Sequence, residues 1–399
     1  MQKDNETPQE LGFRNVVRLG YVSLFTDIST EMILGVLPIF IISLGASAAV
    51  LGIIEGLAEG GNYLFRVISG ILTDRIGRRK PLVLAGYGLS SFAKPLFALA
   101  GTWPQAFVVR FTDRAGKGTR TSPRDTLISD SIKDVEAGKA FGVHRSLDQV
   151  GAVLGPLLAF AIIPLIGIRG LFWISFIPAA VALFLLLFFV RDTKAPPRHE
   201  NVFKDARKVL THEMILLLAV IGVFNIGAYD YSFILLKAGL LGISDPVILT
   251  LVYATLNIAT VILGYPSGIL ADKIGKIPVL VLSYAMFLIT SFAGFSLFGN
   301  SIFAFVIAFF FGCYLAISDT VQRAMIPEFT QPELKGTAYA LYYALIGSCY
   351  LVANSVFGFL WTNWNPSFAF QYSVITATAG VVALIGFVLL RGRLHRLGN

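Results

Sequence analysis

The sequence predicts an all-α polytopic membrane protein with twelve transmembrane helices arranged in two six-helix bundles. Of the 399 residues, 55% are hydrophobic and only 14% are charged, and the mean hydropathy is +0.73. A soluble domain carries about 25% charged residues. A transmembrane helix needs about 20 mostly apolar residues, so the chain is long enough for roughly a dozen. These values exclude a water-soluble enzyme and a protein held by a single membrane anchor.

Apolar runs, separated by polar, glycine or proline breaks, predict where the helices lie. The first six are expected near residues 16–44, 48–72, 81–101, 104–126, 139–165 and 170–190. The second six are expected near residues 212–241, 246–270, 278–298, 301–324, 336–360 and 366–390. Residues 191–211 are polar and contain two consecutive prolines, which predicts a cytoplasmic linker between an N-terminal bundle (1–190) and a C-terminal bundle (212–399).

The basic residues are concentrated in alternate connections between the predicted spans. The intervening connections near Ala46, Gly101, Ser244, Gly299 and Asn363 carry no Lys or Arg. The positive-inside rule then places both termini in the cytoplasm of a multi-pass protein of the inner (cytoplasmic) membrane. This distribution also accounts for the net charge of +8 without a nucleic-acid partner.

An internal repeat supports the division into two bundles. The segment Gly70-Ile-Leu-Thr-Asp74-Arg75-Ile-Gly77-Arg78 recurs 198 residues later as Gly268-Ile-Leu-Ala-Asp272-Lys273-Ile-Gly275-Lys276. The same offset places Gly138–Gly142 over Gly336–Ala340. Because six predicted spans separate the copies, the halves have the same orientation. Parallel six-helix repeats with a site at their interface are typical of secondary transporters.

The repeated segment matches G-x-L-x-D-R-x-G-R-[RK], and it resembles the signature loop of the major facilitator superfamily. A second pattern, g-x8-G-x3-G-P in the fifth helix, is matched by Gly142, Gly151, Gly155 and Pro156, and in that superfamily it marks mainly antiporters. The glycine pair that ends this pattern is replaced by Ala159-Phe160. The resemblance covers the whole twelve-span layout, and two further segments, 27–32 and 114–125, resemble a bacterial and archaeal group labelled generic or drug-efflux transporters.

The signature loop predicts a conformational latch on the cytoplasmic side. Glycine allows close packing and a tight turn, and an aspartate can face the exposed amides at a helix N-terminus. The resemblance implies that Asp74 meets the eleventh helix near Gly336, and the repeat suggests that Asp272 meets the fifth helix near Gly138. A positively charged topogenic turn is the alternative. The latch residues are Gly70, Asp74, Arg75, Gly77, Arg78 and Asp272.

Ionisable residues inside the spans are the second functional signal. Each charge at the bilayer centre costs about 2.5–3.5 kcal/mol on insertion scales, so such residues are retained for a reason. The first half holds Asp27, Glu31, Glu55, Glu59, Arg66, Lys94, Arg110, Asp113 and Arg114, whereas the second holds Asp230, Lys237, Asp319 and Arg323. Stripes of charge on three separate helices predict a wet shared cavity, and structural ion pairs are the alternative. This asymmetry places proton coupling mainly in the first half.

The resemblance implies that the first, fourth, seventh and tenth helices line the pathway, which gives these residues roles. The expected proton-coupling acids are Asp27, Glu31, Glu59 and Asp113, with Asp27 beside Arg110 as first choice. Glu59 has its own predicted partner in Arg66. The expected substrate-binding residues are Arg110, Arg114, Asn225, Tyr229, Asp230 and Asp319. On the fifth helix, His144, Arg145 and Asp148 are interpreted as a cytoplasmic-end network, with a proton relay or a metal site as the alternatives.

These observations predict a proton-coupled secondary active transporter, an exporter that works by antiport of small organic molecules through alternating access. The alternative is proton-coupled uptake of a small organic anion, such as a polycarboxylate or metal chelate, which the cations Arg110, Arg114 and Lys117 suggest. No nucleotide-binding loop or metal-ligand spacing occurs, so no cofactor, bound metal or enzymatic activity is expected. A membrane-embedded enzyme and a solute-sensing receptor are less favoured alternatives. The expected partners are substrate, protons and lipid, and the chain is expected to be monomeric.

Overall fold

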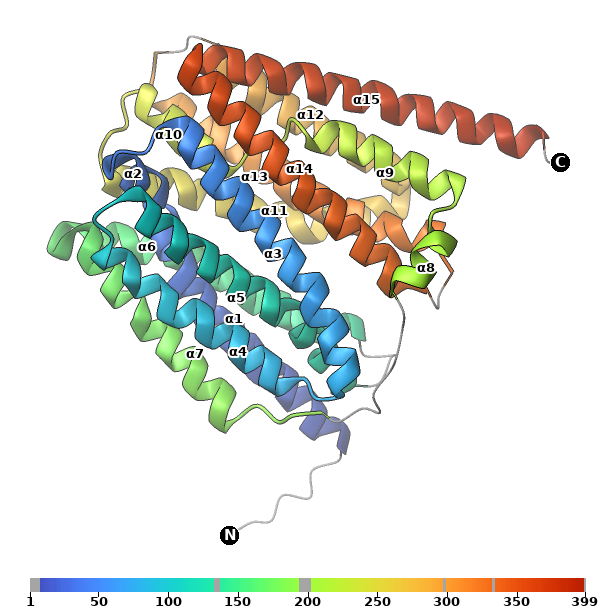
Figure 1. Cartoon of the computed structure of the whole chain (residues 1–399), viewed down its shortest axis with the longest axis horizontal. Helices are drawn as coiled ribbons and strands as arrows, with labels where there is room; N and C mark the ends of the chain where they lie inside the picture. The colour runs from blue at the N-terminus through green and yellow to red at the C-terminus, as the bar shows by residue number, and fades with distance from the viewer. Residues whose placement is uncertain (1–7, 133–136, 194–201, 297–298, 332–333, 398–399) are drawn as a thin grey trace. The chain divides into compact units, whose positions relative to one another are not determined.

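The computed structural model describes residues 8–132, 137–193, 202–296, 299–331 and 334–397 (Figure 1). Part of the predicted linker, residues 194–201, lies outside them. In the first half of the chain the helices are α1 (Pro8–Leu34), α2 (Leu37–Ser43), α3 (Ala48–Ile76), α4 (Lys80–Ala93), η1 (Lys94–Leu99), α5 (Trp103–Asp130), α6 (Ala137–Ile174) and α7 (Phe176–Phe188). The second half contains α8 (Val202–Val209), α9 (His212–Asn225), α10 (Tyr231–Leu240), α11 (Pro246–Ile274), α12 (Lys276–Phe295), α13 (Ile302–Met325), η3 (Ile326–Phe329), α14 (Lys335–Asn363) and α15 (Pro366–Leu397).

Each of the twelve predicted spans coincides with helices, but several spans are interrupted. The first consists of α1 and α2, which are bent by 41° relative to each other. The seventh is broken between Asn225 and Tyr231 into α9 and α10. The fifth lies in α6, where Gly167 has a φ of 70° that breaks the helical geometry. The sixth begins in the last residues of α6 and continues as α7. The short helix α8 within the predicted linker was not expected from the sequence.

By length and apolarity alone, seven helical segments of the described residues could cross a membrane, or eight if α1 and α2 form one span. The helices α3 and α5 have 29 and 28 residues, which is long enough, but both carry several charged side chains. The helices α9 and α10, with 14 and 10 residues, are each shorter than a bilayer requires. The fifth and sixth predicted spans are counted as one segment, residues 138–188. This merged segment, the two charged helices and the broken seventh span together account for the difference between eight and twelve.

Internal contacts divide the chain into two compact units. The first unit comprises residues 1–40 and 61–200, and the second comprises residues 41–60 and 201–399. The division predicted from the sequence assigns residues 41–60 to the first bundle, whereas the internal contacts group this segment with the second unit. In the second unit, Gly52 and Gly56 of α3 lie directly against Asn354 and Leu351 of α14, which brings the two backbones together.

The internal repeat is visible in the contacts inside each unit. A Cβ on Gly70 would meet the side chain of Ser122, and a Cβ on Gly268, 198 residues later, would meet that of Thr320. The ion pair between Arg79 Nε and Asp130 Oδ2 measures 3.1 Å, and the one between Lys276 Nζ and Glu328 Oε1 measures 2.5 Å. Glu328 follows Asp130 at the same offset. Each repeat therefore ties the loop after its second predicted span to the end of its fourth.

In the first unit, Asp192 anchors the signature loop. Its carboxylate accepts hydrogen bonds from the backbone N–H groups of Arg79 and Lys80, at 3.1 and 2.8 Å, and forms an ion pair with Arg78 at 3.2 Å. These N–H groups lie at the start of α4, where a helix leaves its amides without internal partners. Gly77 permits the turn itself because its φ is 68°. The predicted latch joins residues of different units and stays a prediction.

Replacing Asp192 by Ala is expected to destabilise the protein by about 1 kcal/mol, since loss of an N-cap acceptor costs about 0.5–2 kcal/mol. Thermal unfolding in detergent measures the change. The control is Asp192→Asn, which keeps an oxygen acceptor for the two amides and should retain most of the stability. Equal destabilisation by both variants would show that the charge of Asp192, and not the cap, is what matters.

Candidate functional site

Among the described residues of the first unit, five charged side chains are at most 3% exposed. Lys94 and Arg110 are 0% exposed, Asp113 is 1% exposed, and Arg114 and Arg120 are each 3% exposed. Lys94 begins η1, and the other four lie on α5. Because a buried charge is strongly unfavourable unless it is paired, each of these side chains needs charged or hydrogen-bonding partners nearby.

Asp113 is the acid of this buried charge cluster. Its Oδ1 accepts a hydrogen bond of 2.5 Å from Ser90 Oγ of α4, and its Oδ2 lies 3.9 Å from Arg110 Nη1, one turn earlier on α5. Arg114 and Lys94 also interact electrostatically with it. Asp113 therefore balances cations on both α5 and η1. The sequence placed it on a charged stripe with Arg110 but did not pair it with Ser90 or Lys94.

Lys94 connects the cluster to α1. Its Nζ donates a hydrogen bond of 3.1 Å to Thr30 Oγ1, and it interacts electrostatically with Asp27 and Glu31 as well as with Asp113. The sequence counted Lys94 among the intramembrane charges without a role. Its position within a long apolar run, directly before Pro95, was the only available signal.

A second network continues from Tyr87 of α4. The guanidinium carbon of Arg120 lies 4.5 Å from the centre of the Tyr87 ring, a cation–π contact. The Tyr87 hydroxyl is 3.0 Å from Ser23 Oγ, which is also 2.8 Å from His144 Nε2. Arg124 donates a longer hydrogen bond of 3.5 Å to Ser23 Oγ. The four helices α1, α4, α5 and α6 therefore meet through polar side chains at Ser23.

Two glycines of the antiporter-like pattern, Gly151 and Gly155, pack against the acidic stretch of α1. A Cβ on Gly151 would lie 2.5 Å from the Leu24 carbonyl oxygen and 3.1 Å from Asp27 Cβ. A Cβ on Gly155 would lie 2.8 Å from both Glu31 Cβ and the Met32 backbone nitrogen. Pro156, the next residue, lies inside α6. Two sequence signals that were interpreted separately, the α6 glycines and the α1 acids, therefore meet at one helix contact.

The predicted site residues of the second unit lie in different surroundings. Asp230 caps α10, since its Oδ1 accepts hydrogen bonds from the Ser232 backbone N–H and hydroxyl at 2.9 and 2.6 Å. The Tyr229 ring is buried among Phe287, Phe311, Phe357 and Phe370. Asn225 donates to the carbonyl of Ile221 on its own helix, and Asp319 pairs with Arg323 one turn away. Apart from the Tyr229 ring, which packs against several helices, these contacts are local to one helix, and substrate binding by these residues stays a prediction.

Glu59 lies on the part of α3 that belongs to the second unit, whereas Arg66, its predicted partner, belongs to the first. The Glu59–Arg66 ion pair is therefore still a prediction. Glu31 lies on α1 beside Gly155 and is half-buried. Of the four predicted coupling acids, the structure places Asp27, Glu31 and Asp113 together in the first unit, where Lys94 interacts with all three.

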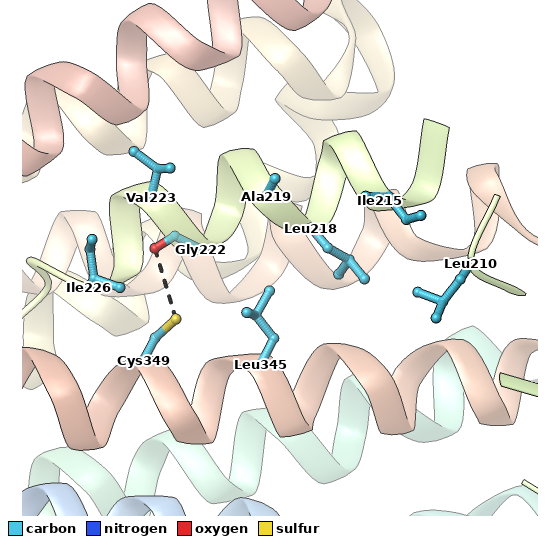
Figure 2. Close-up of a pocket in the computed structure, with 9 residues that line it drawn as sticks. All are labelled: Leu210, Ile215, Leu218, Ala219, Gly222, Val223, Ile226, Leu345 and Cys349. Carbon is cyan, nitrogen blue, oxygen red and sulfur yellow. Dashed lines mark hydrogen bonds between the residues drawn. The ribbon is translucent and has the colours of Figure 1, made fainter. Parts of the chain in front are cut away.

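The second unit contains an open apolar groove of about 470 Å³ between α9 and α14. Figure 2 shows Leu345 and Cys349 of α14 pointing toward α9, where the Cys349 thiol approaches the Gly222 carbonyl oxygen at 3.9 Å. The lining side chains are apolar apart from this thiol. Such a groove fits hydrocarbon and offers no charged group for proton or anion chemistry.

Comparison with known proteins identifies the family of membrane proteins to which this chain belongs. The sequence pattern described as Major Facilitator Superfamily matches residues 19–262 and 218–397. The chain therefore belongs to the major facilitator superfamily of secondary transporters, as the signature loop predicted, and it is a multi-pass membrane protein and not an enzyme.

The chain is similar along its whole length to an uncharacterized MFS-type transporter of Methanocaldococcus jannaschii, with 33% identity over 396 residues, 96% of this chain and 97% of the relative. It is 29% identical to the multidrug resistance protein MdtG of Proteus mirabilis over 189 residues, 46% of each protein. The crystal structure of the peptide transporter POT in complex with sulfate has the same fold, with a TM-score of 0.76 at 14% identity, over 96% of this chain and 95% of that one. The predicted fold class is thereby confirmed.

Proposed function

We propose that this secondary transporter exports small organic molecules in exchange for protons. The observation that carries the proposal is the packing of Gly151 and Gly155 against Asp27 and Glu31, which joins the antiporter-like pattern to intramembrane acids in the same unit. A site that binds and releases protons within a helix contact can change which conformation is stable. Similarity to a multidrug resistance protein over 46% of the chain supports export.

Within this proposal, Asp27 carries the proton and Glu31 is the second candidate. Asp27 is half-buried on α1, and Lys117 and Lys94 interact with it electrostatically from α5 and η1. Arg110, the cation that the sequence placed beside Asp27, forms an ion pair with Asp113 on its own helix. We assign Arg110, Arg114 and Asp113 to charge balance in the interior. Lys117 is the cation whose interaction with Asp27 changes when Asp27 gains or loses its proton.

Uptake of a small organic anion is the second candidate function. It is favoured by the buried charge cluster, in which four of the five side chains, all except Asp113, are cations. Cations in a dry interior bind carboxylate or phosphate groups through strong charge-assisted hydrogen bonds. We also propose that both termini lie in the cytoplasm, because connections rich in Lys and Arg alternate along the sequence with connections that carry at most one basic residue.

Everted membrane vesicles with an acidic interior distinguish the two functions. Antiport is expected to drive ethidium into the vesicles as protons leave, whereas symport is expected to empty vesicles preloaded with citrate. Asp27→Asn should abolish the gradient-driven accumulation of ethidium while leaving ethidium exchange between equal pH values. Loss of preloaded citrate without ethidium uptake would favour anion uptake, and the absence of both fluxes would contradict proton-coupled transport of either class.

A further inference from the structure

The register between α1 and α6 places Asp148 opposite Asp27. His144 Nε2 lies 2.8 Å from Ser23 Oγ, and Gly151 lies against Leu24 and Asp27. Asp148 follows His144 by one helical turn, and Asp27 follows Ser23 by one turn, so both carboxyl groups face the same contact. Their side chains are within hydrogen-bonding reach of each other. Gly151 keeps this approach open because it has no side chain to separate the helices.

Charged groups surround the two carboxyls unequally. Around Asp148, Arg145 forms an ion pair at 3.1 Å, and Arg124 and His144 also interact electrostatically. Around Asp27, the interacting groups are Glu31 on the same helix, Lys117 on α5 and Lys94 on η1. The Arg145 side chain is 55% exposed, whereas that of Asp148 is only 15% exposed. Each acid therefore has its own cation in addition to the other acid.

Two ionised carboxylates in contact repel each other, and neither can donate a hydrogen bond. A single proton removes the repulsion and supplies the donor, so such a pair titrates as one coupled unit. We propose that Asp148 is the partner through which Asp27 holds the coupling proton, the two carboxyl groups sharing one proton across the α1–α6 contact. This inference rests on the proposed function and adds to it a residue that the sequence assigned to a different network.

The shared proton gives a physical link between protonation and helix packing. With the proton present, the carboxyls bond α1 directly to α6. When the proton leaves, Asp148 is held by Arg145 and Asp27 by Lys117, and the direct bond between the helices is lost. Proton release therefore weakens the contact between α1 and α6, which is close because Gly151 and Gly155 have no side chains.

Infrared difference spectroscopy of the purified full-length protein in detergent tests the pair. A protonated carboxyl has its own C=O stretch, which disappears when the group ionises. We expect this band at neutral pH in the unaltered protein and expect both Asp27→Asn and Asp148→Asn to remove it. If Asp27 held its proton alone, Asp148→Asn would leave the band in place, and that result would overturn the proposal. Absence of the band from the unaltered protein would also overturn it.

Asp125→Asn is the matched control, because Asp125 is an acid on α5 that pairs with Arg124 at 2.9 Å and is 44% exposed. It should leave the band unchanged. If Asp148→Asn does not yield folded protein, Asp148→Glu moves the carboxyl by one methylene and should shift the band, whereas an independent Asp27 would show no shift. The infrared measurement needs no substrate and no gradient, so it tests the Asp27–Asp148 pair separately from export. The export proposal is contradicted by a different result, namely that the unaltered protein moves no ethidium in vesicles.

Discussion

We expect Asp113→Asn to lower the free energy of unfolding by about 3–5 kcal/mol, the usual cost of removing one partner from a buried charge cluster. Asp113 is 1% exposed and interacts with Arg110, Arg114 and Lys94. Asparagine is similar in size and can still accept the hydrogen bond from Ser90, so packing is preserved while the negative charge is lost. The unfolding transition in detergent, followed by circular dichroism, measures the effect.

Charge balance predicts that a second substitution compensates for the first. Lys94→Met removes one of the buried cations, and the double variant should therefore be more stable than Asp113→Asn alone. Asp319→Asn is the matched control, since Asp319 is 49% exposed and pairs with Arg323 on the surface of α13, where such pairs contribute about 0.3–0.5 kcal/mol. Equal destabilisation by Asp113→Asn and Asp319→Asn would contradict the role of Asp113 as the buried counter-charge.

Gly155→Val is expected to destabilise the protein by about 1–3 kcal/mol, the range for overpacking a close contact, and to abolish gradient-driven transport. The added Cβ would lie 2.8 Å from the Met32 backbone nitrogen, and backbone cannot move aside as a flexible side chain can. The helices α1 and α6 must therefore separate beside Glu31. Gly155→Ala should have a smaller effect in the same direction. Thermal unfolding and vesicle transport give the two measurements.

The same helix provides a control for the glycine itself. A Cβ on Gly142 would meet no atom within 4 Å, so Gly142→Ala should be neutral or should stabilise α6 by up to about 1 kcal/mol through helix propensity. Destabilisation by Gly142→Ala as large as that by Gly155→Ala would show that α6 needs glycine for flexibility along its length and not for its contact with α1.

Much of the fold could be predicted because its signals are local. Apolar runs mark helices wherever a bilayer is the solvent, and every predicted span coincides with described helices. The repeat at an offset of 198 residues implied two related halves, and the Arg79–Asp130 and Lys276–Glu328 ion pairs show that both copies use the same tie. The placement of residues 41–60 could not be predicted, because it depends on which helix α3 meets and not on its own composition.

The candidate site was only partly predictable. Charge in an apolar run identified Asp27, Glu31, Arg110 and Asp113, because the cost of burying an ion makes each one conspicuous. Their partners were not identifiable in this way. Thr30 is the partner of Lys94, Ser90 is the partner of Asp113, and neither residue differs from an ordinary hydroxyl in a transmembrane helix.

The sequence by itself determined the membrane environment, the helical segments, the duplication and the superfamily, since hydropathy and a short repeated motif are properties of neighbouring residues. Only the tertiary structure decided which charges meet. Asp192 caps a helix more than 100 residues away in the chain, and Asp27 faces Asp148 through the register of α6 against α1. The register of two helices depends on how their surfaces pack, and here the close contacts of Gly151 and Gly155 with α1 fix it. Residue spacing within one helix does not reveal which side chains a second helix presents to it.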